Sequence, residues 1–185
     1  MFWRNGYERT SVADLTAAMG IAPPSFYFAF ASKEELFKQV LKHYVETRLR
    51  SAEEAAFNET TARGVAESLL YGLTDLYTDE TCPPGCLAVN CALTCGGETD
   101  SIRTELAVSR KARRQRLRER FQKARDDGDL LPDADPDELA QYLMVVGWGL
   151  AFAAQAGATR KELRITVARA LESWPGAAKS AQSAI

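Results

Sequence analysis

The feature that most constrains this fold is a series of helix-start signals, each followed by apolar residues at helical spacing. Two are capping boxes, in which Ser32 precedes Glu35 and Thr159 precedes Glu162. A third is the run from Asp135 to Glu138, where a capping residue is followed by proline. Strand-like alternation of apolar and polar residues persists nowhere. The sequence therefore predicts an all-α protein.

These signals divide the chain into a small N-terminal unit and a larger helical domain. The predicted helix from Lys33 to about Glu54 links the two, so we expect domains at residues 1–45 and 46–175. The Ala/Ser-rich tail, residues 176–185, is expected to be disordered. The other expected helices cover residues 11–20, 23–30, 61–77, 86–95, 101–127, 136–156 and 161–174.

Charge and hydropathy limit the classes of partner. The formal net charge is -2, so any nucleic-acid contact must come from a local surface. The stretch from Leu139 to Thr159 lacks charged residues and is long enough to span a membrane. Two glutamines, three glycines and the absence of a preceding basic cluster favour a buried helix instead. Because residues 1–7 form no secretory signal, we expect a cytoplasmic protein.

A basic run between Arg103 and Arg125 has two interpretations. It is either a second nucleic-acid surface or the solvated side of a long helix. The buried stripe of such a helix would be Ile102, Leu106, Leu117 and Phe121. Charge runs on helices are common, and an acidic stretch follows this one, so the second interpretation is favoured.

The segment from Thr10 to Phe30 has the pattern of a helix-turn-helix. Two short helices flank Gly20-Ile21-Ala22, where glycine permits a tight turn. Val12, Leu15 and Met19 are expected to line one face of the first helix. Ile21, Phe26 and Phe30 are expected to close a small core from the second. In this arrangement the second helix protrudes toward the DNA major groove.

The run from Phe2 to Tyr44 resembles the DNA-binding domain of the TetR family of transcriptional regulators. The matching residues are Gly6-Tyr7, Thr10-Ser11-Val12, Gly20-Ile21, Ser25-Phe26-Tyr27, Phe30 and Ser32-Lys33-Glu34-Glu35-Leu36. Over the rest of the chain the resemblance is mainly architectural. It implies an N-terminal three-helix DNA-binding domain and a C-terminal helical domain that binds an effector and dimerises.

The resemblance also implies residue roles. Thr10 and Ser11 stand where the family contacts phosphates, as does Lys33 at the next helix start. Tyr27 matches a tyrosine that bonds the DNA backbone. Hydroxyls, lysines and helix N-termini are common phosphate partners. The expected DNA-binding residues are Thr10, Ser11, Pro23, Pro24, Ser25, Tyr27, Phe28 and Lys33.

The chain departs from the family at two places. Phe28-Ala29 stands where many relatives carry a polar residue, so base reading is expected to use apolar contact with thymine methyls. Only the last turn of the family's first helix remains before Gly6, so we expect this helix to be truncated and the true start to lie upstream. Phe2, Trp3 and Tyr7 have the character of an anchored end.

Helical phase suggests where an effector and a second copy of the chain bind. The expected effector residues offer aromatic walls with few polar groups, which suits a small apolar or amphiphilic molecule. They are Tyr71, Asn90, Cys91, Thr94, Tyr142, Trp148 and Phe152. The last two helices are expected to form a four-helix bundle with a partner in a homodimer. Its residues are Leu143, Val146, Leu150, Leu163, Val167 and Leu171.

The four cysteines leave alternatives open. Cys91 and Cys95 are four residues apart, and Cys86 follows Pro-Pro-Gly at a predicted helix start, so a thiol-based sensor or soft-metal site is conceivable. Packing of buried free thiols is favoured over both. The lone histidine, His43, is expected at the surface. The sequence has no familiar catalytic triad, histidine-rich metal site or phosphate-binding glycine loop, so no cofactor is expected, and an enzyme would have to be built on Cys86.

The sequence thus predicts a homodimeric repressor that a small-molecule effector releases from operator DNA. Two alternatives remain. One is a thiol-based stress sensor, and the other is a helical interaction protein that has lost DNA binding. Neither the operator nor the effector follows from the sequence.

Overall fold

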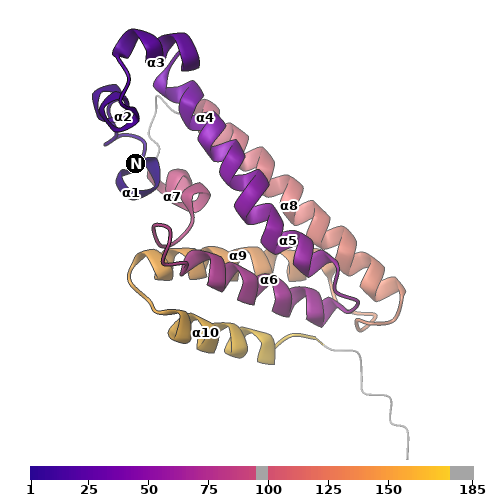
Figure 1. Cartoon of the computed structure of the whole chain (residues 1–185). Coiled ribbons are helices and arrows are strands. Elements are labelled where there is room, and N and C mark those ends of the chain that lie inside the picture. The colour runs from indigo at the N-terminus through magenta and orange to yellow at the C-terminus, as the bar shows by residue number, and fades with distance from the viewer. Residues whose placement is uncertain (95–99, 176–185) are drawn as a thin grey trace, which may run out of the picture.

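The computed structural model describes residues 1–94 and 100–175, and within them every regular element is a helix (Figure 1). The all-α prediction is confirmed. In chain order the elements are α1 (Phe2–Asn5), α2 (Val12–Met19), α3 (Pro23–Phe30), α4 (Lys33–Tyr44), η1 (Val45–Leu49), α5 (Arg50–Phe57), α6 (Ala62–Tyr77), α7 (Leu87–Thr94), α8 (Asp100–Asp126), α9 (Pro136–Gln155) and α10 (Arg160–Glu172).

The predicted caps explain most of the helix starts. Thr159 and Glu162 form the full capping box of α10, and Asp135 accepts the Asp137 N–H ahead of Pro136 in α9. At α4 only half of the expected box forms. The Ser32 hydroxyl accepts the Glu35 N–H, while the Glu35 carboxylate pairs with Lys38.

The helix-turn-helix unit, α1 to α4, is built around aromatic side chains. Phe2 is buried and its ring lies edge-on to Phe37 at 4.9 Å, while Tyr7 lies 5.1 Å from the same ring. This contact anchors α1 on α4, as the sequence predicted for Phe2 and Tyr7. Leu15 and Phe26 are buried, but the prediction for Met19 is wrong. Met19 is the last residue of α2, and its side chain is 42% exposed.

A long helical rod joins this unit to the rest of the chain. Helices α4, η1 and α5 follow one another without a break, and α8 runs beside them (Figure 1). Element η1, between α4 and α5, is a π-helical turn, in which the Arg50 N–H donates to the Val45 carbonyl. The sequence predicted an uninterrupted helix here. Such turns recur at functional sites, because they displace the side chains of one helical turn.

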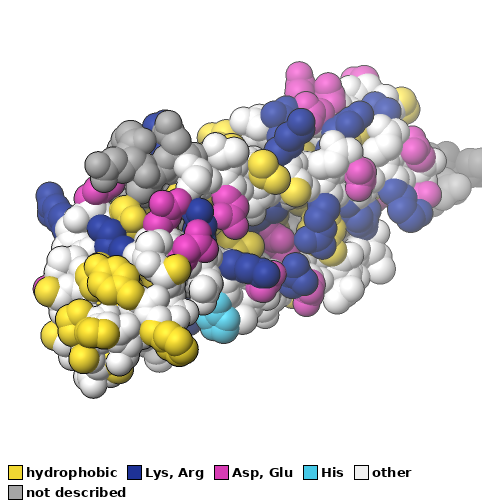
Figure 2. All heavy atoms as spheres, turned by 90° about the horizontal axis from the view of Figure 1, so that it is seen from above, with side chains coloured by type: hydrophobic (Ala, Val, Ile, Leu, Met, Phe, Trp, Pro, Cys, Tyr) yellow, Lys and Arg dark blue, Asp and Glu magenta, His cyan; other side chains and the backbone are white. Residues whose placement is uncertain are grey.

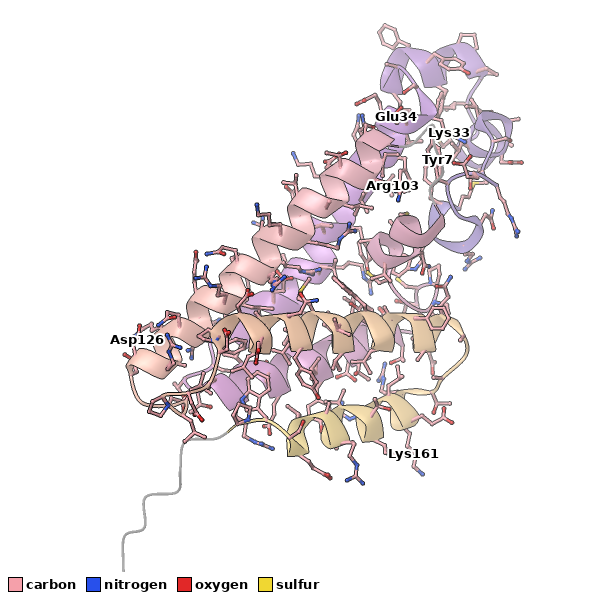
Figure 3. All side chains as sticks on the ribbon, turned by 180° about the vertical axis from the view of Figure 1, so that it is seen from behind. Tyr7, Lys33, Glu34, Arg103, Asp126 and Lys161 are labelled. Atoms are coloured by element: carbon pink, nitrogen blue, oxygen red, sulfur yellow. The ribbon has the colours of Figure 1, made fainter. Side chains whose placement is uncertain are left out.

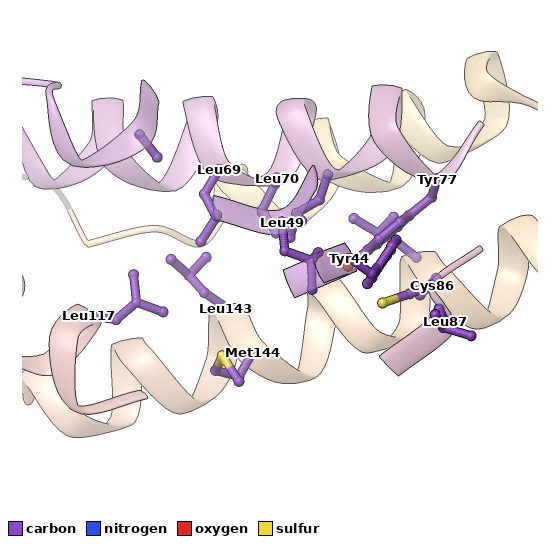
Figure 4. Close-up of a cluster of buried hydrophobic side chains, with 14 of the residues drawn as sticks. Tyr44, Leu49, Leu69, Leu70, Tyr77, Cys86, Leu87, Leu117, Leu143 and Met144 are labelled. Carbon is purple, nitrogen blue, oxygen red and sulfur yellow. The ribbon is translucent and has the colours of Figure 1, made fainter. Parts of the chain in front are cut away.

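The body of the protein, α5 to α10, encloses one apolar core. Helix α9 packs on α6 and α8, and α10 lies against α6 and α9. Figure 4 shows part of this core, where Leu49, Leu70 and Leu143 converge from η1, α6 and α9. Gly147 permits the close approach of α9 to α6, because a Cβ there would lie 3.2 Å from Leu73.

Most of the side chains predicted for the dimer interface lie inside this core instead. Val146 is half-buried, but the other five are buried within the single chain and cannot meet a second copy: Leu143, Leu150, Leu163, Val167 and Leu171. The prediction chose the stripe of α9 and α10 that faces α6. The apolar residues on the outer stripe are different ones, and they are described below.

The basic run lies on α8, where most of its arginines are engaged within the chain. Arg113 and Arg116 pair with Glu53 of α5, and Arg114 pairs with Asp137 of α9. Arg120 donates to two backbone carbonyls before α6. Ile102, Leu106, Leu117 and Phe121 are buried, as predicted. The solvated-helix interpretation is therefore favoured by the structure.

Within the described residues, no helix combines the length and the apolar character needed to cross a membrane. The uncharged stretch after Leu139 belongs to α9, which is one wall of the core. The predicted tail, residues 176–185, and Cys95 lie outside the described residues.

Candidate nucleic-acid interface and ligand pocket

The turn between α2 and α3 has the geometry that the sequence predicted. Gly20 ends α2 in the left-handed region with φ 66°, a conformation that side chains disfavour. Pro23 and Pro24 then open α3, where their fixed φ suits a first turn and their missing N–H groups break no helical bond. This arrangement sends α3 out to the tip of the molecule (Figure 1).

Helix α3 presents a mixed polar and apolar surface to solvent. Pro23, Pro24 and Ser25 at its start are exposed, Tyr27 is 52% exposed and Phe28 is 95% exposed. Figure 2 looks onto this tip and shows hydrophobic side chains gathered there. The Phe28 side chain therefore contributes almost nothing to packing within the protomer.

The two hydroxyl residues before α2 differ from each other. Thr10 is fully buried, and its hydroxyl donates to the Gly6 carbonyl at 2.8 Å, so the predicted phosphate contact of its side chain is wrong. The burial follows from its role in closing the turn after α1. Ser11 is exposed and caps α2 in a box with Asp14. The Ser11 hydrogen bonds hold the pKa of Asp14 below its ordinary value.

Lys33, at the first position of α4, is tied to the α1 segment. Its Nζ donates to the Tyr7 carbonyl at 3.3 Å and lies 4.1 Å from the centroid of the Tyr7 ring. Figure 3 shows Lys33 and Tyr7 side by side. Lys33 is half-buried, so its ammonium is positioned while still reachable from solvent. The neighbouring Lys38 differs, because Glu34 and Glu35 both hold it.

The body contains a pocket of about 610 Å³ between η1, α7, α8 and α9. This volume lies within the range of small-molecule sites. Its apolar walls are Val45, Leu49, Val89, Leu106, Trp148 and Phe152. Its polar groups are Tyr77, Cys86, Ser109, Arg110 and Arg113.

The floor of the pocket is a buried group of hydroxyl and thiol side chains. Tyr77 and Cys86 line it, and Figure 4 shows Tyr44 beside them. Burial, reinforced by the Cys86 side chain, raises the pKa of both tyrosines well above the usual 10. Both phenols are therefore neutral and can donate a hydrogen bond at any physiological pH.

Two of the seven predicted effector residues, Trp148 and Phe152, line this pocket. Two others face α10 instead. Tyr71 stacks under Arg164, and the Tyr142 hydroxyl donates to the Ala170 carbonyl, so neither lines this pocket. Asn90 and Cys91 are buried in α7 away from the pocket wall. The side chain of Thr94 lies outside the described part of the chain.

The sequence contains a signal for the α8 wall of the pocket. The buried stripe of α8 passes from Leu106 to Leu117, and the positions between them on that face are Ser109, Arg110 and Arg113. Three polar residues within an otherwise apolar stripe indicate that the helix there faces a cavity rather than the core. The contribution of η1 carried no comparable signal, because it depends on how two distant helices pack.

The outer face of α9 and α10 carries large apolar side chains. Tyr142, Val145 and Phe152 follow one stripe of α9, with exposures of 37%, 50% and 60%. Gly149 lies on the same stripe, and a Cβ there would meet nothing within 4 Å. On α10, Ile165 is 62% exposed. Exposed apolar stripes on neighbouring helices are typical of protein–protein interfaces.

Two comparisons of sequence decide the family. Residues 1–40 match "Bacterial regulatory proteins, tetR family", and residues 67–170 match "Tetracyclin repressor-like, C-terminal domain". The chain belongs to the TetR family. The transcriptional repressor ComR of Escherichia coli K12 is 30% identical over 177 residues, which cover 95% of this chain and 84% of ComR. DhaR, a transcriptional repressor of Mycobacterium sp. strain GP1, is 26% identical over 148 residues, or 80% of this chain and 73% of DhaR.

A solved structure supports the same assignment. The TetR family transcriptional regulator CifR, as a cysteine mutant complexed with a 26-bp double-strand operator DNA, is 39% identical. It superposes with a TM-score of 0.88 over 94% of this chain and 91% of its own. The predicted family, and with it the prediction of a DNA-binding transcriptional regulator, is confirmed.

Proposed function

We propose that this TetR family member represses transcription by placing α3 in the major groove of an operator. The observation that carries the proposal is the exposed tip of α3, which presents Ser25, Tyr27 and Phe28 to solvent. Lys33 begins the next helix, α4. Tyr27 and Lys33 would contact the backbone, and Phe28 would contact thymine methyls. The Ser11 N–H and hydroxyl already serve Asp14, so Ser11 would add a positive helix end rather than a free hydroxyl.

The test uses DNA recovered from genomic fragments by the intact protein. Lys33→Ala should weaken binding to specific and nonspecific DNA alike and lower the salt slope by about one unit, because one phosphate contact is lost. Lys38→Ala is the matched control, since two carboxylates neutralise Lys38, and its salt slope should stay unchanged. Fluorescence anisotropy at several salt concentrations measures both. An unchanged slope in Lys33→Ala would remove Lys33 from the interface.

We propose that an effector in the pocket releases the operator by moving α4. The pocket lies between η1, which continues α4, and α8. The first turn of α8 also reaches α4, because the Ser101 hydroxyl bonds Glu34, the residue next to Lys33. The Ser101 and Lys38 hydrogen bonds hold the pKa of Glu34 below its ordinary value, so this carboxylate remains charged. A ligand that separates η1 from α8 would therefore reposition Lys33 and the packed α3.

We propose that the outer stripe of α9 and α10 forms a homodimer, so that two α3 helices reach successive major grooves. Its apolar residues are Tyr142 and Ile165, together with Val145 and Phe152, which also line the pocket and are exposed at its edge. Ile165→Glu should convert a dimer into a folded monomer, as sedimentation velocity at micromolar concentration would show. A folded wild-type monomer would contradict this proposal.

A second candidate function is thiol sensing, which one observation favours: Cys86 lies in the pocket wall. An electrophile held there would meet its Sγ. Treatment with N-ethylmaleimide should then modify Cys86 and release DNA, and Cys86→Ser should abolish the release. Modification without release would leave non-covalent binding as the mechanism. In either case we propose that the protein acts in the cytoplasm by binding rather than by catalysis. Its single histidine, His43, is exposed on α4, as the sequence predicted.

A further inference from the structure

The pocket has an asymmetric charge that narrows the chemistry of its ligand. Two cations, Arg110 and Arg113, line it, whereas none of the described aspartates or glutamates does. Both arginines belong to α8, and they enter from the same wall as Ser109. The other walls are aliphatic and aromatic, with Leu49, Trp148 and Phe152 among them. A ligand that fills this space therefore meets positive charge at one side and apolar surface at the others.

The two arginines are not equivalent. The Arg113 guanidinium donates to the carboxylate of Glu53, which is itself buried, so its charge is already balanced inside the protomer. Arg110 has no ion pair or side-chain hydrogen bond with any described residue. The residues three and four positions away on α8 are Leu106, Ala107, Arg113 and Arg114, so its own helix supplies no carboxylate.

Arg110 is also partly withdrawn from solvent. Its side chain is half-buried, in contrast to that of the adjacent Lys111, which is exposed. Most other arginines of α8 have an acidic or carbonyl partner, as described above. A guanidinium that is half-buried without a counter-charge loses hydration, and an anion placed against it would restore the lost interactions.

We propose that the effector is an amphiphilic carboxylate, with its anionic group on Arg110 and Ser109 and its apolar body against Trp148 and Phe152. The guanidinium fork matches a carboxylate in two parallel hydrogen bonds, and the Ser109 hydroxyl donates a third. Tyr77 and Cys86 on the floor meet the distal end of the ligand. This inference rests on the proposed function, because it names the class of molecule that releases the operator.

The test compares decanoate with decanol, two probes that share an apolar chain and differ in charge. Trp148 lies in the wall, so its fluorescence reports binding by the full-length protein, and Trp148→Phe assigns the signal. The wild type should bind decanoate at least about tenfold more tightly than decanol, because even one of the proposed charge-assisted hydrogen bonds supplies about that factor in affinity. Arg110→Gln should remove the preference and Arg110→Lys should retain part of it. Lys111→Gln, the matched control, should leave it unchanged.

Equal affinity for the two probes, no binding of decanoate, or a preference that survives Arg110→Gln would each overturn the ligand class. Operator release is measured separately, by anisotropy of the recovered DNA with each probe. Release by decanoate that is lost in Arg110→Gln supports both proposals. Binding of decanoate through Arg110 without any release supports the ligand class and contradicts effector release, so the two failures are distinguishable.

Discussion

The helix-turn-helix unit and the body differ in how far their large apolar and charged side chains are buried and paired. In the body, Glu53 is buried between Arg113 and Arg116, and the leucines of α9 and α10 are enclosed. In the helix-turn-helix unit, Phe28 is almost fully exposed. Among the residues that the structure describes, the Lys33 ammonium has the Tyr7 carbonyl and the Tyr7 ring as its partners.

This difference separates side chains that stabilise the protomer from those that await a partner. Enclosed groups contribute to the free energy of unfolding, while exposed apolar and half-satisfied charged groups contribute little to it and are available for binding. By this criterion we propose Phe28, Lys33, the outer stripe of α9 and α10, and Arg110 as binding groups. The predictions below test the division from the largest expected effect to the smallest.

Val167→Glu should have the largest effect and should unfold the chain. Val167 is fully buried in the body, so the new carboxylate would lose its hydration without gaining a partner. The free energy of unfolding should fall by about 4 kcal/mol or more. Urea denaturation followed by circular dichroism measures it. The control is Ile165→Glu, two residues away on the exposed face, measured at a protein concentration low enough for the wild type to be monomeric. There its urea midpoint should equal that of the wild type. A loss as large as that of Val167→Glu would contradict the contrast between enclosed and exposed side chains.

Glu53→Ala should cost about 3 kcal/mol, because it leaves the Arg113 guanidinium in a partly buried site without its counter-charge. The comparison is with Glu35→Ala in the helix-turn-helix unit. Glu35 is exposed beside Lys38, so its removal should cost less than about 1 kcal/mol. Chemical denaturation of the two variants gives both values, and equal costs would contradict the contrast between the regions.

Gly20→Ala should destabilise the protein by about 1 kcal/mol through the backbone alone. Gly20 has φ 66°, and a Cβ there would meet nothing within 4 Å. Gly128 in the body is a matched control, since it has φ 81° and equally open surroundings. Thermal melts should show similar losses for Gly20→Ala and Gly128→Ala, while only Gly20→Ala should weaken DNA binding. Equal losses of DNA affinity in both variants would show that the affinity depends on overall folding stability rather than on the turn at Gly20.

The contacts that connect the helix-turn-helix unit to the body should make the free energy of unfolding depend on acidic pH. Arg48 of η1 lies against Trp3 of α1 and pairs with Asp79 after α6. Hydrogen bonds from Thr81, and then from Arg48, lower the pKa of Asp79 from 3.8 to about 2. Because the folded-state pKa is depressed, this contribution to stability is present above pH 3.8 and is lost as the pH falls toward 2.

Asp79→Asn should therefore remove part of the acid dependence. Between pH 4 and about 2, the urea midpoint of the wild type should decline more steeply than that of Asp79→Asn. Parallel decline in both proteins would show that Asp79 does not link folding to pH. The same titration with Asp75→Asn, an exposed carboxylate near α10, supplies the control.

The sequence by itself determined the helices and the helix-turn-helix. Caps such as Ser11 with Asp14 and Thr159 with Glu162 act over three residues, and Gly20 with Pro23 defines one turn. The DNA-binding face follows from the same local pattern, since α3 has few turns and Phe26 must face inward, which leaves Tyr27 and Phe28 outside. Thr10 is the exception, because its burial depends on the turn after α1.

Only the tertiary structure decided which faces of α9 and α10 are enclosed and where the pocket lies. Both helices are apolar on more than one side, so periodicity could not separate Val167 from Ile165 or Leu150 from Phe152. The pocket is assembled from η1, α7, α8 and α9, segments that are far apart in the chain. The unpaired state of Arg110 has the same origin, because an arginine in a basic helix differs from its neighbours only through the partners that folding brings to them.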